Sequence, residues 1–348
     1  MRKLCLVMCL SVAPLLLLFA VGCSGGVTPV AAPASGVTGT AAAARAPSST
    51  TGPVPAMAVP TEATKHRLGV LAVETFLADV AQNVAGTRLK IDALMPIGAD
   101  PHSFEPTPGD FARLAASEVV IINGAGFEEP LEKLLTADKG KQRIIVASAG
   151  LTSREEGDED AGTDETKEDH NHAADPHFWL DPNNVMKYVE NIRDGLSEVD
   201  PEGSATYAAN AAAYSAQLKD LDRWIVEQVK HIPPENRLLV TNHESLGYFA
   251  DRYGFKIIGT VLPSVGTGTS PSAQQMARLV DRIRSVQAKA IFLETGSNTQ
   301  LAEQVARETG VTVVMQLHTH SITESGGVAP TYIDMMKFNT RAIVDALK

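Results

Sequence analysis

The sequence predicts an α/β protein of two lobes, each a sandwich of helices on a parallel β-sheet, joined by one long rigid helix. Three observations predict this fold. Short apolar runs of strand length alternate with amphipathic helical stretches in two halves of the chain, which is the pattern of parallel βαβ units. One helical pattern of roughly 30 residues separates the halves. The chain of 348 residues is long enough for two such lobes.

The first lobe is expected over residues 66–200. Its predicted strands and helices alternate along the chain, with a helix at 75–86 that Thr75 would cap and Gly86 would end. A loop, "GADPHSFEPTPGD", follows the second strand. The predicted strands are 67–73, 89–96 and 118–126, and the further helices are 108–117 and 185–198.

The linking helix is expected over residues 201–232. Apolar side chains recur there at steps of three and four, with no interior Pro or Gly, which predicts one continuous helix. Its length of about 45 Å exceeds one small lobe, so we expect it to join two. The apolar stripe is Tyr207, Ala211, Tyr214, Leu218, Leu221, Ile225 and Val229.

The second lobe, over residues 233–348, repeats the alternation of strand and helix. We expect Ser270 or Ser272 to cap its second helix and Pro330 to begin its last. The predicted strands are 237–242, 255–262, 288–295 and 311–317, and the predicted helices are 244–254, 272–286, 298–310 and 330–348.

The N-terminus predicts export. Two basic residues precede an uncharged apolar run, so residues 1–22 are typical of a secretory signal. The run ends in "FAVGC", which resembles the site at which bacterial lipoproteins are cleaved and lipidated on Cys23. An uncleaved membrane anchor is the alternative, and both place the rest of the chain outside the cytoplasm. Residues 23–65, rich in Ala, Pro, Gly, Ser and Thr, would form a flexible tether.

Composition narrows the function. The net charge of −11 argues against a nucleic-acid partner. All three cysteines lie within the first 23 residues, so a metal site in the folded part must use His and carboxylate ligands. Residues 152–175 form a strongly acidic segment that also contains His170 and His172. It is either a solvated surface insertion or a device that collects metal ions near a binding site.

Four histidines stand at or just after expected strand ends, two in each half: His102, His177, His243 and His320. Such folds bind ligands in the crevice beyond the carboxyl ends of the strands. His102 and His177 both follow Asp-Pro, and the fixed φ of proline would preset where each imidazole points. His243 is open to another interpretation, as a buried or helix-capping residue. Together the four predict a metal site in the cleft between the lobes.

The sequence resembles a known family, the zinc and manganese receptors of bacterial ABC importers. The resemblance covers nearly all of residues 66–348 and is carried by "GADPHSFEPTPGD", "DPHFWLDP", "HESLGYFADRYG" and the ending "TYIDMMKFNTRAIVDAL". It implies a receptor that delivers metal to a membrane permease and catalyses no reaction.

The resemblance also implies the ligands. The family uses the histidines of both Asp-Pro-His loops, here His102 and His177, and a third ligand that is His243 here. The fourth position is commonly Asp, and this chain has His320 there, so the chain departs from the family's pattern. His318, two residues earlier, is the second candidate because it would share a face with His320 in an extended strand. Water is the third.

Ligand chemistry favours zinc. Three or four neutral imidazoles suit Zn²⁺, whereas Mn²⁺ prefers oxygen ligands. Four His ligands would fill the Zn²⁺ coordination shell. Cu²⁺ and Ni²⁺ also bind imidazole, so zinc specificity comes from the resemblance. We expect affinity to fall below about pH 6 as imidazoles become protonated. Glu244 and Glu294 are candidate acceptors for imidazole N–H groups.

The expected protein is therefore a monomeric zinc receptor, anchored to the cell membrane through Cys23 in the periplasm or on the cell surface. The alternatives are a receptor for manganese or another divalent metal, an extracytoplasmic zinc hydrolase with Glu244 as general base, and a metal-binding adhesin. The hydrolase would need an open coordination position.

Overall fold

The computed structural model describes residues 68–128, 131, 135, 142–154, 174–262, 267–268 and 270–348. The expected signal segment and tether, with Cys23, lie outside the described residues. The same holds for most of the acidic segment, including His170 and His172. Within the described ranges, no helix is both long enough and apolar enough to cross a membrane.

The first sheet is fully parallel in the order β2-β1-β3-β4. The three predicted strands are confirmed, although each is shorter than expected. β4 was not predicted, because only one of its four residues is buried and its apolar run is short. The strands are β1 (Val70–Ala72), β2 (Ile91–Ala93), β3 (Val119–Ile122) and β4 (Arg143–Val146).

Local capping sets the helix ends in this half. The helix α1 (Thr75–Ala85) has Glu74 at its N-cap rather than Thr75, and Gly86 follows it at φ 61° as predicted. The helix α2 (Pro108–Ala116) starts with a reciprocal capping box between Thr107 and Asp110. Further helical segments in the described part of this half are η1 (Pro101–Ser103), η2 (Phe178–Leu180) and α4 (Pro182–Val199).

The second sheet repeats the topology of the first, in the parallel order β6-β5-β7-β8. In both sheets the first strand lies between the second and the third, so each sheet has a crevice at the carboxyl end of its first strand. The strands are β5 (Leu238–Thr241), β6 (Lys256–Thr260), β7 (Ala290–Glu294) and β8 (Thr312–Leu317).

The helices of this half are also near their predicted places, with corrected starts. Ser272 caps α7 as one of the two expected residues. Thr331 caps α9 by accepting from Asp334, which leaves Pro330 outside the helix. The helices are α6 (Gly247–Tyr253), α7 (Ala273–Val286), α8 (Gln300–Thr309) and α9 (Tyr332–Leu347), and η4 (Pro234–Asn236) precedes β5.

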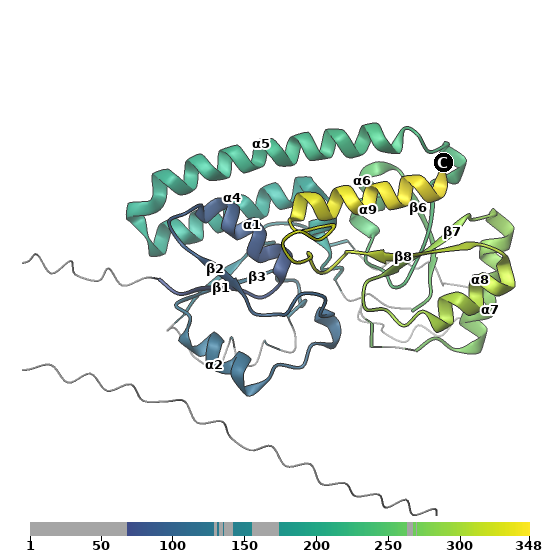
Figure 1. Ribbon diagram of the computed structural model, residues 1–348, viewed down its shortest axis with the longest axis horizontal. Coiled ribbons are helices and arrows are strands. Elements are labelled where there is room, and N and C mark those ends of the chain that lie inside the picture. The colour runs from purple at the N-terminus through teal and green to yellow at the C-terminus, as the bar shows by residue number, and fades with distance from the viewer. Residues whose placement is uncertain are drawn as a thin grey trace, which may run out of the picture. The chain divides into compact units, whose positions relative to one another are not determined.

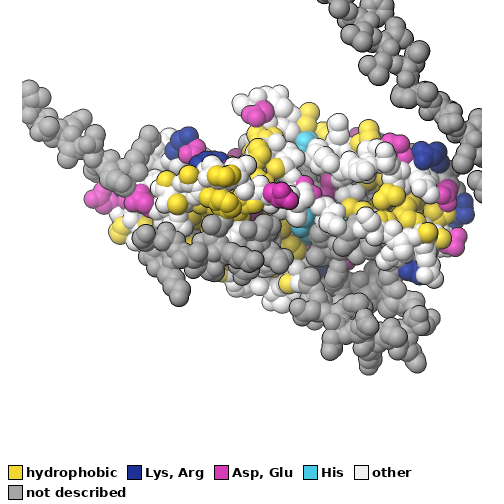
Figure 2. All heavy atoms as spheres, turned by 90° about the horizontal axis from the view of Figure 1, so that it is seen from below, with side chains coloured by type: hydrophobic (Ala, Val, Ile, Leu, Met, Phe, Trp, Pro, Cys, Tyr) yellow, Lys and Arg dark blue, Asp and Glu magenta, His cyan; other side chains and the backbone are white. Residues whose placement is uncertain are grey.

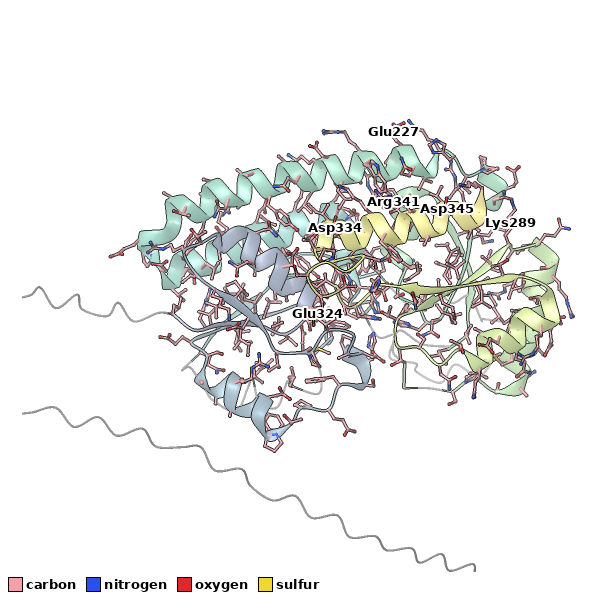
Figure 3. All side chains as sticks on the ribbon, in the orientation of Figure 1. Glu227, Lys289, Glu324, Asp334, Arg341 and Asp345 are labelled. Atoms are coloured by element: carbon pink, nitrogen blue, oxygen red, sulfur yellow. The ribbon has the colours of Figure 1, made fainter. Side chains whose placement is uncertain are left out.

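The long helix is α5 (Ser204–Val229), preceded by η3 (Pro201–Gly203), and every residue of its predicted apolar stripe is buried. It runs along one side of both sheets and packs on α4 and α1 of the first half and α6 and α9 of the second (Figure 1). Arg341 of α9 lies over the Trp224 ring of α5 at 5.3 Å from its centroid, and Figure 3 shows Arg341 on the α9 face beside α5. One hydrophobic cluster extends from the first sheet through these helices to the second.

Candidate metal centre

The structure brings together the four histidines predicted from the two halves. One ring nitrogen from each of His102, His177, His243 and His320 lies within 4.8 Å of the others. The six distances between pairs of ring centroids all fall between 5.1 and 5.5 Å. Four points with six nearly equal separations form a tetrahedron, which is the coordination geometry of structural zinc.

One pair of ring nitrogens has the spacing that zinc requires. Zn–N bonds of about 2.0–2.1 Å place tetrahedral ligand atoms about 3.3–3.4 Å apart. The Nε2 atoms of His102 and His177 are 3.2 Å apart. Two neutral imidazoles can share a proton at this distance, and a metal ion between them would replace that contact.

Three of the four imidazoles are buried, and His102 is partly buried. His177 and His243 are fully buried and His320 is 8% exposed. Figure 2 accordingly shows only small patches of histidine on the face seen from below. The Nε2 atoms of His243 and His320 have no hydrogen-bond partner among the described residues. A buried polar nitrogen without a partner is costly, and a metal ion would satisfy both atoms.

In the first lobe, aspartates orient the histidines. Asp100 accepts a hydrogen bond from the backbone N–H of His102 at 3.0 Å. Asp175 accepts from the backbone N–H of His177 at 2.9 Å and also lies 2.9 Å from its Nδ1. The second contact directs Nε2 of His177 toward the other ligands. Sequence reasoning credited the prolines and missed the aspartates, although an Asp two residues before each His was visible.

In the second lobe, one carboxylate serves two imidazoles. Oε2 of Glu294, the last residue of β7, lies 3.1 Å from Nδ1 of His243 and 3.4 Å from Nδ1 of His320. Ser245 donates to the other oxygen of Glu294 at 2.6 Å. The carboxylate expected to accept from an imidazole therefore lies at ion-pair distance from two imidazoles, while Nδ1 of His243 makes no hydrogen bond among the described residues. His243 does not cap a helix, because α6 begins only at Gly247.

Burial and charge give the four imidazoles different protonation behaviour. Burial lowers the pKa of His102 to about 4 and holds the pKa values of His177 and His320 well below the usual value. Burial also acts on His243, but the facing carboxylate of Glu294 outweighs it and raises the pKa of His243. His243 therefore holds a proton to a higher pH than the other three imidazoles do.

His318 does not join this group. The strand β8 ends at Leu317, so the expectation that His318 and His320 share a strand face is wrong. Asn339 of α9 accepts from the backbone N–H of His318 and donates to its carbonyl oxygen. The imidazole of His318 packs on the ring of Phe338, with centroids 5.2 Å apart.

Aromatic rings enclose the centre. Phe127, which follows β3, lies 5.2 Å from the His102 ring and 5.9 Å from the His177 ring, measured between centroids. Trp179 stacks on Phe76 and donates from Nε1 to the carbonyl of Thr319 at 2.6 Å. Trp179 is fully buried and serves as packing around the centre. Phe127 was missed, because nothing in "NGAGFEE" marks it apart from its place after a strand.

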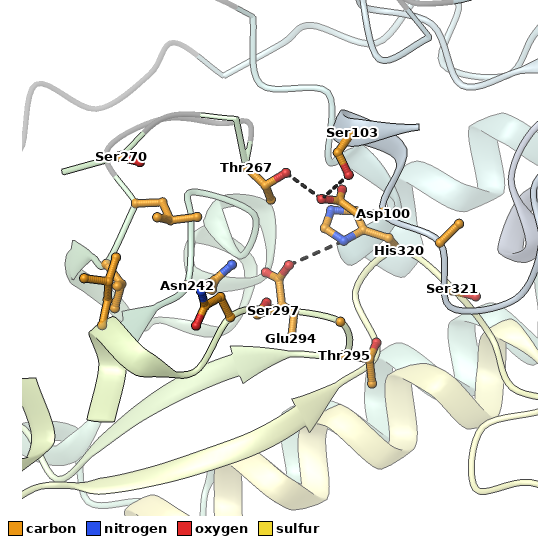
Figure 4. Close-up of a pocket in the computed structure, with 16 residues that line it drawn as sticks. Asp100, Ser103, Asn242, Thr267, Ser270, Glu294, Thr295, Ser297, His320 and Ser321 are labelled. Atoms are coloured by element: carbon orange, nitrogen blue, oxygen red, sulfur yellow. Dashed lines mark hydrogen bonds and ion pairs between the residues drawn. The ribbon is translucent and has the colours of Figure 1, made fainter. Parts of the chain in front are cut away.

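A polar cavity of about 340 Å³ opens beside the centre, lined by residues that include His320, Glu294 and Asn242. Figure 4 shows Asp100 of the first lobe and Thr267 of the second meeting at its edge, where Thr267 donates to Asp100 at 2.5 Å. The same Asp100 caps the backbone of His102. The cavity therefore borders the His320 side of the centre.

Comparison with known proteins also indicates a metal-binding protein. Residues 70–346 match the model of a protein family described as zinc-uptake complex component A, periplasmic. The manganese-binding lipoprotein MntA of Halalkalibacterium halodurans is 35% identical over 281 residues, which cover 80% of this chain and 88% of that protein.

Two solved structures have a similar fold. The Mn-bound periplasmic metal binding protein from Candidatus Liberibacter asiaticus is 29% identical, with a TM-score of 0.71, and the match covers 81% of this chain and all of that one. The periplasmic zinc binding protein TroA from Treponema pallidum is 26% identical, with a TM-score of 0.72, and the match covers 81% of this chain and 99% of that one.

Proposed function

Because the chain belongs to the family described as zinc-uptake complex component A, periplasmic, we propose that it is an extracytoplasmic receptor for Zn²⁺. It captures the ion and delivers it to the membrane permease of an ABC importer. The observation that carries this proposal is the tetrahedral group of four imidazoles drawn from both lobes.

The ligand chemistry supports zinc as the cargo. The four candidate ligand atoms are imidazole nitrogens, and the nearby carboxylate of Glu294 faces Nδ1 atoms rather than the centre. Imidazole suits Zn²⁺, while Mn²⁺ prefers carboxylate and water oxygens. A fourth imidazole would also fill the tetrahedron and leave no position for a reacting water, so the protein binds and releases metal without catalysis.

A receptor of this kind acts at the membrane surface. The lipobox-like "FAVGC" supports anchoring through a lipid on Cys23, with residues 23–65 as the tether and residues 66–348 as a monomeric receptor. In the acidic segment, His170 and His172 would gather zinc near the cleft.

Manganese is the second candidate cargo. It is favoured by the relatives, because the 35% identical lipoprotein of H. halodurans is named as manganese-binding and one similar structure is Mn-bound. Against it stands the absence of an oxygen atom among the four candidate ligand atoms in the described part of the chain.

Metal competition decides between these cargoes. The full chain, purified without a His tag, is offered equal Zn²⁺ and Mn²⁺, and the bound metal is measured by mass spectrometry. We expect one Zn²⁺ per chain and almost no Mn²⁺. The variant His320→Asp introduces an oxygen ligand and should shift the ratio toward Mn²⁺. Equal occupancy of the wild-type protein by both metals would overturn the zinc proposal.

A further inference from the structure

Two glutamates are buried at the crevice of the first sheet, apart from the four histidines. Glu74 is 1% exposed and Glu128 is 6% exposed, and they follow the neighbouring strands β1 and β3. Glu74 lies two residues past the end of β1, as His243 lies two residues past the end of β5. The position that holds a metal-ligand candidate in one lobe therefore holds a carboxyl group in the other.

Of the two carboxyl groups, only that of Glu128 accepts hydrogen bonds from the described backbone. Glu128 accepts from the backbone N–H of Asn123 and, at 3.0 Å, from that of Gly124. Gly124 has φ of +91°, and a Cβ there would lie 2.6 Å from the side chain of Val146, so this turn depends on glycine. Neither oxygen of Glu74 has a donor among the described residues.

The surroundings indicate what occupies the space between the carboxyl groups. Glu74 and Glu128 line a small cavity with room for about one water molecule, and its other walls are apolar. A divalent cation would need several further oxygen ligands, which these walls do not offer. A proton needs none, since a protonated Glu74 can donate directly to Glu128. The apolar walls are Val73, Met95, Pro101, Phe104, Phe127 and Leu131.

We propose that Glu74 is a positioning residue for the metal centre, which it serves by keeping its proton and donating it in a hydrogen bond to Glu128. The inference rests on the proposed metal-receptor function. The pair is linked to both histidine loops of its lobe through neighbouring residues. Pro101, next to His102, lines the cavity. The side chain of Asn123, whose backbone binds Glu128, donates at 3.0 Å to the carbonyl of Pro176, next to His177.

The same pair supports Phe127, which precedes Glu128 and packs edge-on against the His102 ring. If both carboxyl groups were ionised, two negative charges would face each other in an apolar space and push these elements apart. A shared proton removes that repulsion and keeps the loops at the spacing that the ligands require.

The titration of the pair gives the proposal a distinctive signature. Burial, and then the charge of Glu128, raise the pKa of Glu74 well above its usual value, and burial raises the pKa of Glu128 to about 7. Burial, and then the charges of Glu128 and Glu74, raise the pKa of Tyr188, whose hydroxyl donates to Asn123. A carboxyl group with a raised pKa stabilises the folded state only while protonated, so stability falls as the pH rises through that pKa.

The test compares the wild-type full chain with Glu74→Gln, Glu74→Leu and the exposed control Glu105→Gln. Glutamine keeps a donor for Glu128 and cannot ionise. We expect Glu74→Gln and the control to bind zinc within about threefold of the wild type, and Glu74→Leu to bind about 10- to 100-fold more weakly. The zinc-free melting temperature of the wild type should fall relative to that of Glu74→Gln as the pH rises above about 5, where an ordinary carboxyl group has lost its proton.

Each outcome is decisive. Unchanged zinc affinity in Glu74→Leu would overturn the positioning role, and identical pH profiles for wild type and Glu74→Gln would overturn the shared proton. If Glu74→Leu does not fold, these pH profiles still test the proton. A second bound metal that Glu74→Gln loses would assign the space to a cation instead. If the wild type bound no metal at all, the receptor function would fail, while the zinc-free melting curves would still report on the pair.

Discussion

His320 occupies the position that the family resemblance assigns to Asp, and its geometry makes it a full ligand candidate. Its unpartnered Nε2 is buried among the other imidazoles, while its Nδ1 faces Glu294. We expect His320→Ala to weaken zinc binding by more than about 100-fold, beyond the usual effect of losing a residue that only orients a ligand. His318→Ala is the matched control, because that imidazole packs on Phe338. Chelator competition measures both, and equal affinities in the two variants would argue against His320 as the ligand.

The pKa values of individual histidines also determine how zinc binding depends on pH. The sequence alone suggested joint protonation of the histidines below about pH 6. The structure separates them, since the pKa of His243 is raised by Glu294 and that of His102 is lowered to about 4. Below the pKa of His243, zinc must displace one proton, so affinity should fall about tenfold per pH unit between about pH 6.5 and 5. A steeper fall, measured by competition titration, would mean that several histidines protonate together.

Glu294→Gln is the control for this pH dependence. Without the carboxylate, His243 loses the strongest effect that raises its pKa, while the burial that lowers this pKa stays, so the fall between about pH 6.5 and 5 should flatten. The overall affinity should drop about 10- to 100-fold, because the imidazoles lose the acceptor that orients them. A wild-type pH slope in this variant would remove Glu294 as the cause.

At the scale of elements, we expect that the acidic segment can be removed without loss of the metal centre. Its flanking residues are in contact, since the backbone N–H of Asp175 donates to the carbonyl of Arg154 at 3.3 Å. Arg154 is also held by Asp175 and, at 2.6 Å, by Asp251 of α6. Replacing residues 155–173 by two glycines should therefore keep zinc affinity within about threefold, as all four ligand candidates lie outside the segment.

The same deletion tests whether the segment collects zinc. If its carboxylates, His170 and His172 raise the local zinc concentration, cells carrying the deletion should take up less zinc when zinc is scarce and a normal amount when it is plentiful. Isotope uptake at both concentrations measures this. Normal uptake at scarce zinc would reduce the segment to a solvated insertion.

The elements that sequence predicted best were those with long repeated patterns. The seven-residue stripe of α5 specified a helix because one face of it must be buried. The strand β4 has too few buried residues to give a comparable signal. The sequence near His318 and His320 could not show which of the two faces the metal centre. That choice depends on Asn339 of α9, 21 residues after His318, which bonds both the backbone N–H and the carbonyl of His318.

At the scale of the whole receptor, the lobes are not independent bodies. One hydrophobic cluster contains Ala72 of the first sheet, Leu239 of the second and the buried stripe of α5 between them. Polar contacts cross the cleft beside the centre as well, since Ser321 lies 3.1 Å from the hydroxyl of Thr75 and accepts from the backbone N–H of Gly98. A wide hinge opening would have to break this shared core.

Zinc release should therefore proceed through small shifts of the lobes and loops rather than through hinge opening. Because Ser321 adjoins His320, a small movement of that loop would break the contact with Thr75 and withdraw one ligand, while α5 and its packing stay intact. We expect solution scattering of one sample, with zinc and after chelation, to show a change in radius of gyration of less than about 1 Å. The variant His320→Ala should show no change on adding zinc at a level that saturates only the wild type. A change of several ångströms in the wild type would mean that the shared core separates, and that α5 acts as a hinge rather than as a rigid link.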